Sequence, residues 1–358
     1  MDFKPIEYME WMKTRERVKY DFCRSGVKDM SLKDLGIKAD DLEIFGENSY
    51  GFPPLIKAVA DRYKVEEENV MLTQGTSHAL FLVCASLLKE GDEVLVEMPA
   101  YEPLRAVPQA FGARVLRLER RFETGYTVQL DEFEQRLSPG IKCVLLTNLH
   151  NPSGAVMSSS TLKDMAEIAR RKDVVLVIDE IYLEFLESDS GQTSFHLGDN
   201  MAVISSLTKV FGLGDLRCGW VLATPELVKR MKIIQDYSII EGVFIGELIS
   251  SIIFGRLDAI REKKSKRIST NLRMIKEFVE GESRLEWIKP AGGVICFPRI
   301  INGLTGDEMA RILRKEFDTA VIPGKLFEDS RHFRLGFDAG TEELAFVLDS
   351  MGQILERY

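Results

Sequence analysis

Residues 174–182 read Val-Val-Leu-Val-Ile-Asp-Glu-Ile-Tyr and follow a helical pattern at Ser160–Arg171. Five consecutive apolar residues, most of them β-branched, predict a strand that is buried on both faces of a sheet. Asp179 ends this strand, and a carboxylate that is buried without a partner is costly. Asp179 is therefore either a binding residue at the edge of the sheet or a cap for the segment that follows.

Similar apolar runs lie on both sides of this strand. They are separated by helical patterns such as Thr76–Lys89, and continuous apolar strands alternating with helices are typical of a mainly parallel sheet covered on both faces. The sequence therefore predicts an α/β fold. The expected strands are Asn69–Thr73, Glu93–Glu97, Ala113–Leu118, Lys142–Thr147, Val174–Ile178, Met201–Ser205 and Gly219–Ala223.

The pattern changes after Pro225, where it is helical to about Glu280 with an interruption at Gly255. A second set of shorter elements follows, which indicates a smaller α/β unit at the C-terminal end. The expected elements of this unit are a strand at Val294–Phe297, a helix near Asp307–Phe317, strands at Ala320–Ile322 and Phe333–Phe337, and a helix from Thr341.

The composition argues against several classes of protein. The chain has 358 residues and a formal net charge of −9, so a broad basic surface for nucleic acid is not expected. Its five cysteines are scattered and form no CxxC pair, which predicts a reducing, cytoplasmic location. Its four histidines show no metal-ligand spacing, so we expect no metal. The most apolar long segment, Tyr237–Phe254, contains Glu241 and Glu247, so we expect no membrane span.

Polar residues follow several of the predicted strands. The carboxyl ends of strands in α/β sheets are where ligands bind. The polar segments are Gly75-Thr76-Ser77, Asn151-Pro-Ser-Gly154, Asp179-Glu-Ile-Tyr182 and Ser206-Leu-Thr-Lys209, with Arg217 eight residues further on.

Each of these segments has a second interpretation when it is taken alone. Gly75-Thr76-Ser77 is either an anion site at the start of a helix or an ordinary helix cap. Lys209 is either a desolvated nucleophile near the ligand edge of the sheet or an exposed surface lysine. The absence of a P-loop and of a complete GxGxxG argues against a nucleotide site of either kind.

Taken together, the order and spacing of the four segments resemble the pyridoxal phosphate (PLP) enzymes of fold type I, specifically the class I and II aminotransferases. The resemblance extends from about Asp21 to the C-terminus. It implies a large domain at residues 41–255, a small domain at 256–358 and an N-terminal arm, 1–40, that joins the small domain. It also implies PLP as cofactor and a homodimer with active sites at the subunit interface.

The resemblance assigns a role to each segment. Lys209 would hold PLP as a Schiff base and then act as the base at the substrate Cα. Asp179 would keep the pyridine nitrogen protonated, and Tyr182 and Asn151 would bond the 3-oxygen of the ring. The remaining residues implied at the cofactor are Tyr101, which would stack on the ring, and Gly75, Thr76, Ser77, Ser206, Thr208 and Arg217, around its phosphate.

The resemblance also implies residues for the substrate. Arg334, in Phe333-Arg-Leu-Gly-Phe337, would grip the α-carboxylate, because the fork of a guanidinium suits a carboxylate. Gly26 and Asn151 would lie beside the same carboxylate. Tyr50 directly precedes Gly51, whereas the family usually has several residues between this tyrosine and the glycine. Its role toward substrate or toward the neighbouring subunit's phosphate stays open, as does a salt bridge for Arg334.

The leading function is an aminotransferase that moves an amino group from an L-amino acid to a 2-oxo acid. The same residues also serve β-lyases and amino-acid cyclases of this fold, and no motif chooses between them. A more distant alternative is a PLP-binding sensor without catalysis. About twenty residues precede the matched region, too few for a DNA-binding domain.

Overall fold

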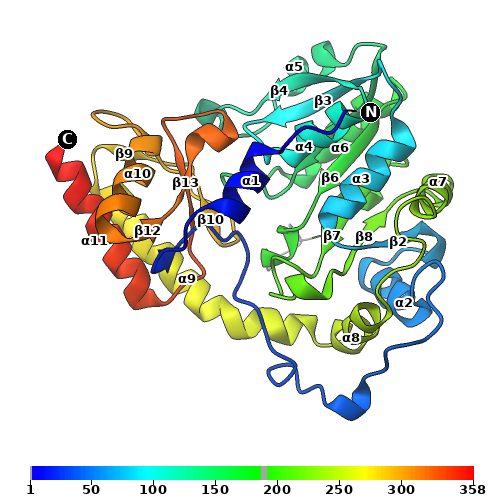
Figure 1. The fold of residues 1–358 in the computed structure, drawn as a ribbon. Coiled ribbons are helices and arrows are strands. Elements are labelled where there is room, and N and C mark those ends of the chain that lie inside the picture. The colour runs from blue at the N-terminus through cyan, green and yellow to red at the C-terminus, as the bar shows by residue number, and fades with distance from the viewer. Residues whose placement is uncertain (1, 187–191) are drawn as a thin grey trace.

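A seven-stranded sheet forms the centre of the larger part of the molecule (Figure 1). The computed structural model describes residues 2–186 and 192–358. The strands of this sheet are β2 (Val70–Thr73), β3 (Glu93–Met98), β4 (Arg114–Glu119), β5 (Ile141–Thr147), β6 (Val175–Asp179), β7 (Met201–Ser206) and β8 (Gly219–Leu222). Their order is β2-β8-β7-β6-β5-β3-β4, and neighbours are parallel except at β8, which is antiparallel to both β2 and β7. The prediction of a mainly parallel sheet is confirmed.

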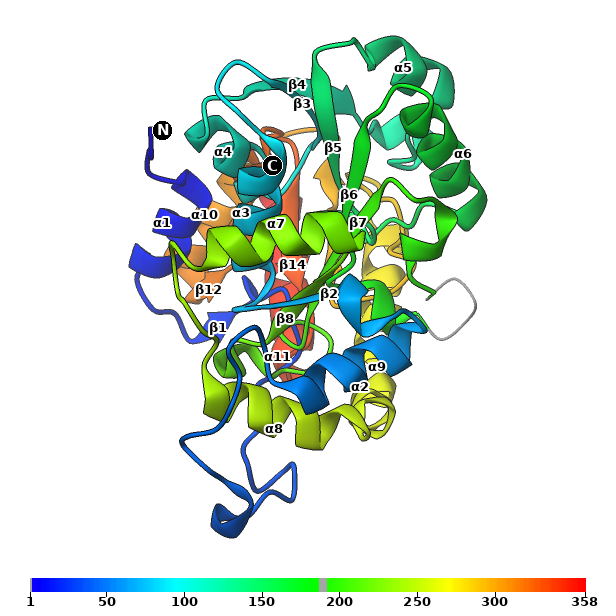
Figure 2. The same cartoon turned by 90° about the vertical axis from the view of Figure 1, so that its right-hand side faces the viewer.

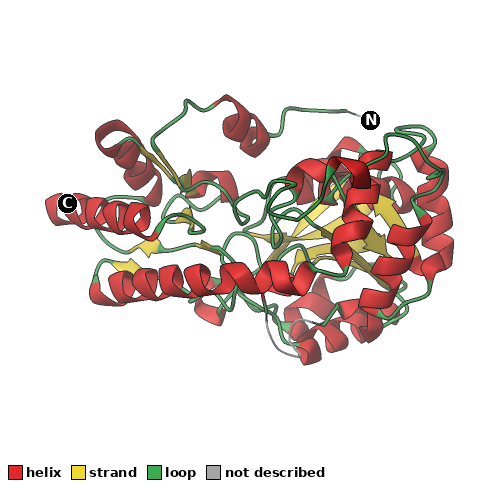
Figure 3. Cartoon of the chain, turned by 90° about the horizontal axis from the view of Figure 1, so that it is seen from below, coloured by secondary structure: helices red, strands yellow, loops and turns green. Residues whose placement is uncertain are grey.

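Helices cover both faces of the sheet (Figures 2 and 3). One face carries α3 (Thr76–Leu87), α4 (Pro103–Ala110) and α7 (Pro225–Gln235). The other carries α5 (Leu130–Arg136) and α6 (Ser159–Arg170) at one end, and α2 (Pro53–Tyr63) and α8 (Phe244–Phe254) at the other.

The strand β6 shows why these strands read as continuous apolar runs. Val177 faces the core that contains α3 and α7, whereas Leu176 and Ile178 face the core that contains α5 and α6. Successive side chains of a strand point to opposite faces, so a strand that is covered on both sides has no polar face. The carboxyl end of β6 is where this burial stops, and Asp179 stands there.

The C-terminal part of the chain forms a second lobe (Figure 1). Its helices are α9 (Leu257–Gly281), α10 (Gly306–Phe317) and α11 (Thr341–Arg357). Its short strands are β9 (Leu285–Glu286), β10 (Ile295–Cys296), β11 (Arg299–Ile300), β12 (Thr319–Ala320), β13 (Ile322–Pro323) and β14 (Phe333–Gly336). Helix α9 connects the lobes, because Leu257 and Ile260 pack in a core with α2 and α8, whereas Ile275 and Val279 pack against α11.

The N-terminal segment also belongs to this second lobe. Its strand β1 (Tyr20–Asp21) pairs in parallel with β12, with Tyr20 opposite Thr319. Its helix α1 (Glu7–Thr14) places Tyr8 in a core with Phe297 and Phe327. The sequence patterns did not predict α1 or β1.

The helical region after Pro225 is less continuous than we expected. The interruption at Gly255 is present between α8 and α9, but residues 236–243 form a further non-helical segment between α7 and α8. The expected strand Ala320–Ile322 divides at Val321 into β12 and β13, because the two halves pair with different partners, β1 and β14. No helix within residues 2–186 or 192–358 has the length and apolar composition needed to cross a membrane.

Asn271 links α9 to the segment between β14 and α11. Its side chain is fully buried, and Nδ2 donates to the carbonyl oxygens of Phe337, at 2.8 Å, and Ala339, at 3.0 Å. We expect Asn271→Ala to lower the free energy of unfolding by about 1–3 kcal/mol, because it leaves buried carbonyl groups without donors. Urea denaturation measures this change. The control Ser269→Ala, on the same helix, should change it by less than about 0.5 kcal/mol, and equal effects of both variants would contradict the assignment.

Candidate active site

A cavity of about 370 Å³ lies at the carboxyl ends of β5, β6 and β7. Two larger cavities, of about 500 and 550 Å³, contain none of the predicted site residues. The structure therefore brings most of the predicted residues to one place. The predicted residues that line this cavity are Gly26, Thr76, Ser77, Tyr101, Asn151, Asp179, Tyr182, Thr208, Lys209 and Arg217.

Lys209 projects into this cavity from the loop after β7. Burial lowers the pKa of its amine to about 8, and the positive charges of Arg334, Arg24 and Arg217 act in the same direction. The backbone N–H of Val27 donates to the Lys209 carbonyl oxygen at 2.9 Å. A Cβ at Gly26 would lie 3.0 Å from both Cα and Cδ of Lys209, so glycine suits this position because the two chain segments approach so closely.

Asp179 lies at the end of β6, opposite Thr147 at the end of β5. Its Oδ1 accepts the backbone N–H of Ile181 at 3.0 Å. Burial raises the pKa of this carboxyl group to about 7, and the charge of Glu97 adds to the effect. No ion pair within 4.0 Å joins Asp179 to Lys209, although both residues line the cavity. The site thus holds two opposite charges that leave room for a group between them.

A second part of the cavity suits an anion. Gly75, at φ +80°, is the N-cap of α3 and has no side chain to satisfy the first N–H groups of the helix. A Cβ at Gly75 would lie 2.7 Å from Nη2 of Arg217, so the guanidinium fits against the bare turn. Nη2 donates to the Gln74 carbonyl oxygen at 3.0 Å. Free helix N–H groups next to a guanidinium and the hydroxyls of Thr76 and Ser77 are typical of a phosphate site.

Ser206 does not line the cavity. It is buried at the end of β7, and its Oγ accepts the backbone N–H of Thr208 at 3.2 Å. It therefore supports the loop that carries Thr208 and Lys209.

Arg334 is fully buried behind the cavity wall. Its Nη1 donates to Oδ1 of Asn151 at 2.9 Å. Its Nη2 donates to the hydroxyl of Tyr8 at 2.8 Å and to the carbonyl oxygen of Cys23 at 3.0 Å. Its Nε has no hydrogen-bond partner within the described part of the chain. Arg334 forms no salt bridge with a carboxylate in residues 2–186 or 192–358.

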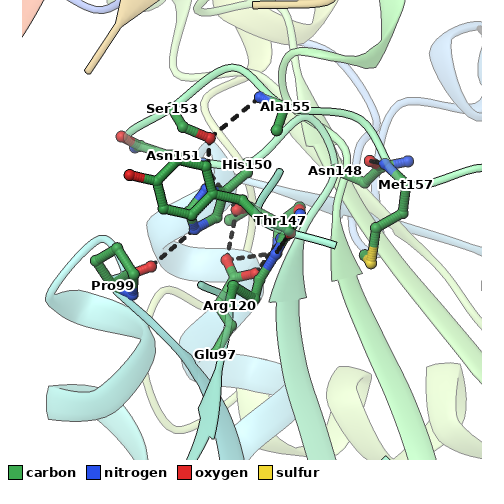
Figure 4. A network of polar contacts seen from close by, with 11 residues as sticks. Glu97, Pro99, Arg120, Thr147, Asn148, His150, Asn151, Ser153, Ala155 and Met157 are labelled. Carbon is green, nitrogen blue, oxygen red and sulfur yellow. Dashed lines mark hydrogen bonds and ion pairs between the residues drawn. The ribbon is translucent and has the colours of Figure 1, made fainter. Parts of the chain in front are cut away.

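A polar network beneath the cavity orients Asn151 (Figure 4). Glu97 and Arg120 form a fully buried ion pair, and Glu97 also accepts the backbone N–H of Thr147 at 2.8 Å. The hydroxyl of Thr147 donates to Glu97 as well, which leaves its oxygen free to accept the backbone N–H of Asn151 at 2.9 Å. The chain of bonds therefore runs from a buried carboxylate to the residue that contacts Arg334.

His150 completes this network without facing the cavity. Its Nε2 lies 2.8 Å from the carbonyl oxygen of Pro99, which only accepts, so Nε2 carries the proton and Nδ1 accepts the hydroxyl of Ser153 at 2.7 Å. Burial holds the pKa of this imidazole well below its usual value. His150 is thus a neutral, fixed residue that supports the Asn151–Gly154 turn.

The sequence patterns did not predict that the N-terminal segment forms one wall of the cavity. Tyr8, Met9 and Met12 of α1 line the cavity, and the Tyr101 hydroxyl donates to Sδ of Met9 at 3.3 Å. Ser25 also lines the cavity and hydrogen-bonds the Tyr182 hydroxyl, whose pKa burial raises. The only signal was the spacing of Met9 and Met12, which places them on one face of a helix but does not say what that face covers.

Tyr50 does not line the cavity of its own chain. Its side chain is 48% exposed, its hydroxyl donates to Oδ2 of Asp236 at 3.3 Å, and Lys232 lies over its ring. A role for Tyr50 in a neighbouring subunit stays a prediction.

The arrangement fits the cofactor that the sequence pattern predicted. The cavity combines an amine of lowered pKa, a carboxylate without an ion-pair partner inside it and a separate anion site at the start of α3. An aldehyde, a protonated ring nitrogen and a phosphate on one small planar molecule match these three features in turn.

Comparison with known proteins gives the same answer. The sequence profile of the family "Aminotransferase class I and II" matches residues 39–347. The chain is 28% identical to capreomycidine synthase of Streptomyces vinaceus over 98% of this chain and 93% of that protein. It is 30% identical to arginine–pyruvate transaminase of Pseudomonas aeruginosa over 81% of this chain and 77% of that protein.

A crystal structure of a PLP-dependent aminotransferase from Streptococcus suis superposes with a TM-score of 0.94 and 26% identity, covering 100% of this chain and 99% of that chain. The fold is therefore fold type I, and the cofactor is PLP. With a family profile that spans most of its length, the chain belongs to the class I and II aminotransferases.

Proposed function

We propose that this protein is an aminotransferase that moves an amino group from an L-amino acid to a 2-oxo acid. The observation that carries the proposal is the geometry of the cavity. An amine of lowered pKa, Lys209, faces the same small space as Asp179, and Arg334 lies directly behind Asn151 in its wall. The 30% identity to an arginine–pyruvate transaminase supports the same reaction class.

Bound PLP supplies an aldehyde that holds amines covalently and a ring that withdraws electrons from the substrate Cα. Lys209 would hold the cofactor through its amine, and this amine would also serve as the general base for the proton at the substrate Cα. A lysine with a pKa of about 8 is partly neutral near neutral pH, which this role requires. Asp179 holds the proton on the pyridine nitrogen, because a cation placed next to this carboxylate stabilises its charged form.

The other cavity residues position the cofactor. In this proposal Tyr182 and Asn151 would bond the 3-oxygen of the ring, and Tyr101 would stack on the ring. The residues that hold the phosphate are Gly75, Thr76, Ser77, Ser206, Thr208 and Arg217, of which Ser206 acts through the loop it supports.

Arg334 binds the α-carboxylate of the substrate, with Gly26 beside it. Amino acids and 2-oxo acids both carry this carboxylate, so the same arginine serves both halves of the reaction. The network of Glu97, Thr147 and Asn151 fixes Nη1 of Arg334 and thereby aims the guanidinium.

One observation favours a second candidate. The relative that this chain matches over 98% of its length is named for the synthesis of capreomycidine and not for a transamination. A cyclase or a β-lyase uses the same proton removal at Cα, so Lys209 and Asp179 would keep their roles. The reactions differ in what leaves next, which depends on the substrate.

The substrates therefore decide between the candidates. We expect the PLP-loaded protein, mixed with a panel of L-amino acids that includes arginine and with pyruvate, to convert pyruvate to alanine in step with loss of one donor. Amino-acid chromatography measures both. Lys209→Ala should lose this activity and the borohydride-reducible link to PLP.

The other outcomes are equally distinct. Release of ammonia without alanine would mean elimination, and a product that forms without loss of pyruvate would mean cyclisation. Binding of PLP with no turnover of any donor would favour a sensor.

The burial of Lys209 also predicts a pH dependence of stability in the cofactor-free protein. The folded-state pKa is lowered from 10.5 to about 8, so burial of the charged amine destabilises the fold fully below pH 8 and not at all above about 10.5. We expect the stability of the wild type relative to Lys209→Met to rise between these pH values by up to about 3 kcal/mol. Thermal unfolding at several pH values measures this difference. For Lys263→Met, which removes an exposed lysine, no such rise is expected, and a flat difference for Lys209→Met would contradict the assignment.

We further propose a homodimer. The loop at residues 42–51 and the segment 236–243 are joined by the bond from Nδ2 of Asn48 to the Gly242 carbonyl oxygen at 3.1 Å, and we treat their exposed apolar side chains together as one patch. Its most exposed members are Ile44, Phe45, Tyr237 and Ile240, with exposures of 83%, 77%, 90% and 67%. Exposed apolar side chains gathered in this way mark interaction surfaces. Tyr50 lies in this patch, where it would meet a second copy.

Replacing Phe45 in the patch tests the dimer. We expect Phe45→Glu to convert dimers to monomers at micromolar concentration, as sedimentation velocity measures, because the charge would be buried without a partner. Phe3→Glu, which changes another exposed phenylalanine outside the patch, serves as control and should leave the mass unchanged. A wild-type protein that is monomeric would refute the proposal.

The state of the five cysteines supports a proposal for the compartment in which the protein works. All five are unpaired and buried. Free thiols persist in reducing compartments, so we propose that the enzyme works in the cytoplasm.

A further inference from the structure

The substrate position on Arg334 is already partly taken by a protein group. Nη2 has two N–H donors, and they go to the hydroxyl of Tyr8, at 2.8 Å, and to the main-chain carbonyl of Cys23, at 3.0 Å. Nη1 donates to Asn151, and Nε has no partner among the described residues. Of the five N–H groups of the guanidinium, only that of Nε and one of Nη1 thus have no acceptor among the described residues, whereas both N–H groups of Nη2 are in use.

The two bonds already made by Nη2 conflict with bidentate binding of a carboxylate. A guanidinium offers paired N–H groups along two edges, one formed by Nε and Nη2 and the other by Nη1 and Nη2. Both edges need an N–H of Nη2. The free Nε marks the first edge as the one that a carboxylate would use, so one of the two present acceptors must leave Nη2.

The two acceptors differ in how readily they can move. The Cys23 carbonyl belongs to a backbone segment that is held by two further hydrogen bonds, since the backbone N–H of Phe22 donates to the Ala320 carbonyl at 2.9 Å and that of Cys23 donates to Oδ1 of Asp21 at 3.0 Å. The Tyr8 hydroxyl is at the end of a side chain that itself lines the cavity. Its ring packs edge-on against Tyr101, with 5.2 Å between the ring centroids.

We infer that the Tyr8 hydroxyl occupies the place of one carboxylate oxygen on Arg334 and is displaced from Nη2 when a substrate binds. This inference rests on the proposed role of Arg334. Tyr8 thus sets the affinity of the carboxylate site: it keeps Nη2 of the buried guanidinium hydrogen-bonded in the free enzyme and competes with every incoming carboxylate. Only a ligand that accepts hydrogen bonds from both Nε and Nη2 gains binding free energy when it displaces the Tyr8 hydroxyl.

Propionate is a suitable probe, because it carries a carboxylate but no amine that reacts with the cofactor. We expect Tyr8→Phe to lower the dissociation constant of the PLP-loaded protein for propionate by about two- to tenfold, since the hydrogen bond that competes with the carboxylate is removed. Titration calorimetry measures this constant without turnover. Tyr126→Phe is the matched control, because its buried hydroxyl bonds Nε2 of His332, at 3.2 Å, and not Arg334. It should leave the constant unchanged.

The opposite sign would overturn the inference. Weaker propionate binding by Tyr8→Phe would mean that the hydroxyl donates to the carboxylate, and an unchanged constant would mean that Tyr8 does not compete. Tyr8→Met, which also lacks the hydroxyl, is the second variant in case Tyr8→Phe does not fold, and it must bind propionate more tightly as well.

Arg334→Gln separates this inference from the proposed function. At least tenfold weaker binding by Arg334→Gln supports the carboxylate site, whatever Tyr8→Phe does. If Arg334→Gln binds propionate as the wild type does, the carboxylate site itself is misassigned and the proposed function fails with it.

Discussion

Opposite charges kept apart in a small, largely buried space are the constraint on which this structure depends. Lys209 and Asp179 both face one cavity, and burial moves their pKa values toward each other, to about 8 and about 7. Burial therefore penalises the charged form of each group when the cavity holds nothing else. A charged planar molecule placed between them restores the charged form of Asp179 and takes up the amine of Lys209. The cavity is therefore suited to a charged ligand, and its ionisable groups are less well stabilised while it is empty.

The surrounding polar groups hold this arrangement in place. The ion pair of Glu97 and Arg120 is fully buried, and such a pair stabilises a fold little unless its remaining hydrogen bonds are made. Here Glu97 makes these bonds with Thr147. Thr147 in turn accepts the backbone N–H of Asn151, and Oδ1 of Asn151 accepts Nη1 of Arg334. A buried ion pair can in this way determine the direction of a distant guanidinium.

Much of the fold and of the cofactor site was predictable from sequence. Asp179 is the last residue of β6, and Lys209 and Asn151 lie a few residues after the ends of β7 and β5, so the position of each strand end also largely fixes the position of these residues. Local sequence and site geometry are coupled at these points.

Other parts of the site were not predictable, because they depend on contacts between distant segments. Helix α1 is short, and its first turn is held by Glu102, which accepts the backbone N–H of Tyr8 at 2.6 Å. No periodicity within eight residues reveals this contact. In the same way the sequence pattern identified Arg334 but not its acceptors, Tyr8 and Cys23, which come from more than three hundred residues earlier in the chain.

The pairing of β1 with β12 has a consequence for biosynthesis. Tyr8 precedes Arg334 by more than three hundred residues in the chain. During synthesis the carboxylate pocket therefore cannot form until β14 has been made, and a chain that is cut off before β14 has the lysine for the cofactor but lacks the arginine for the carboxylate of an amino acid.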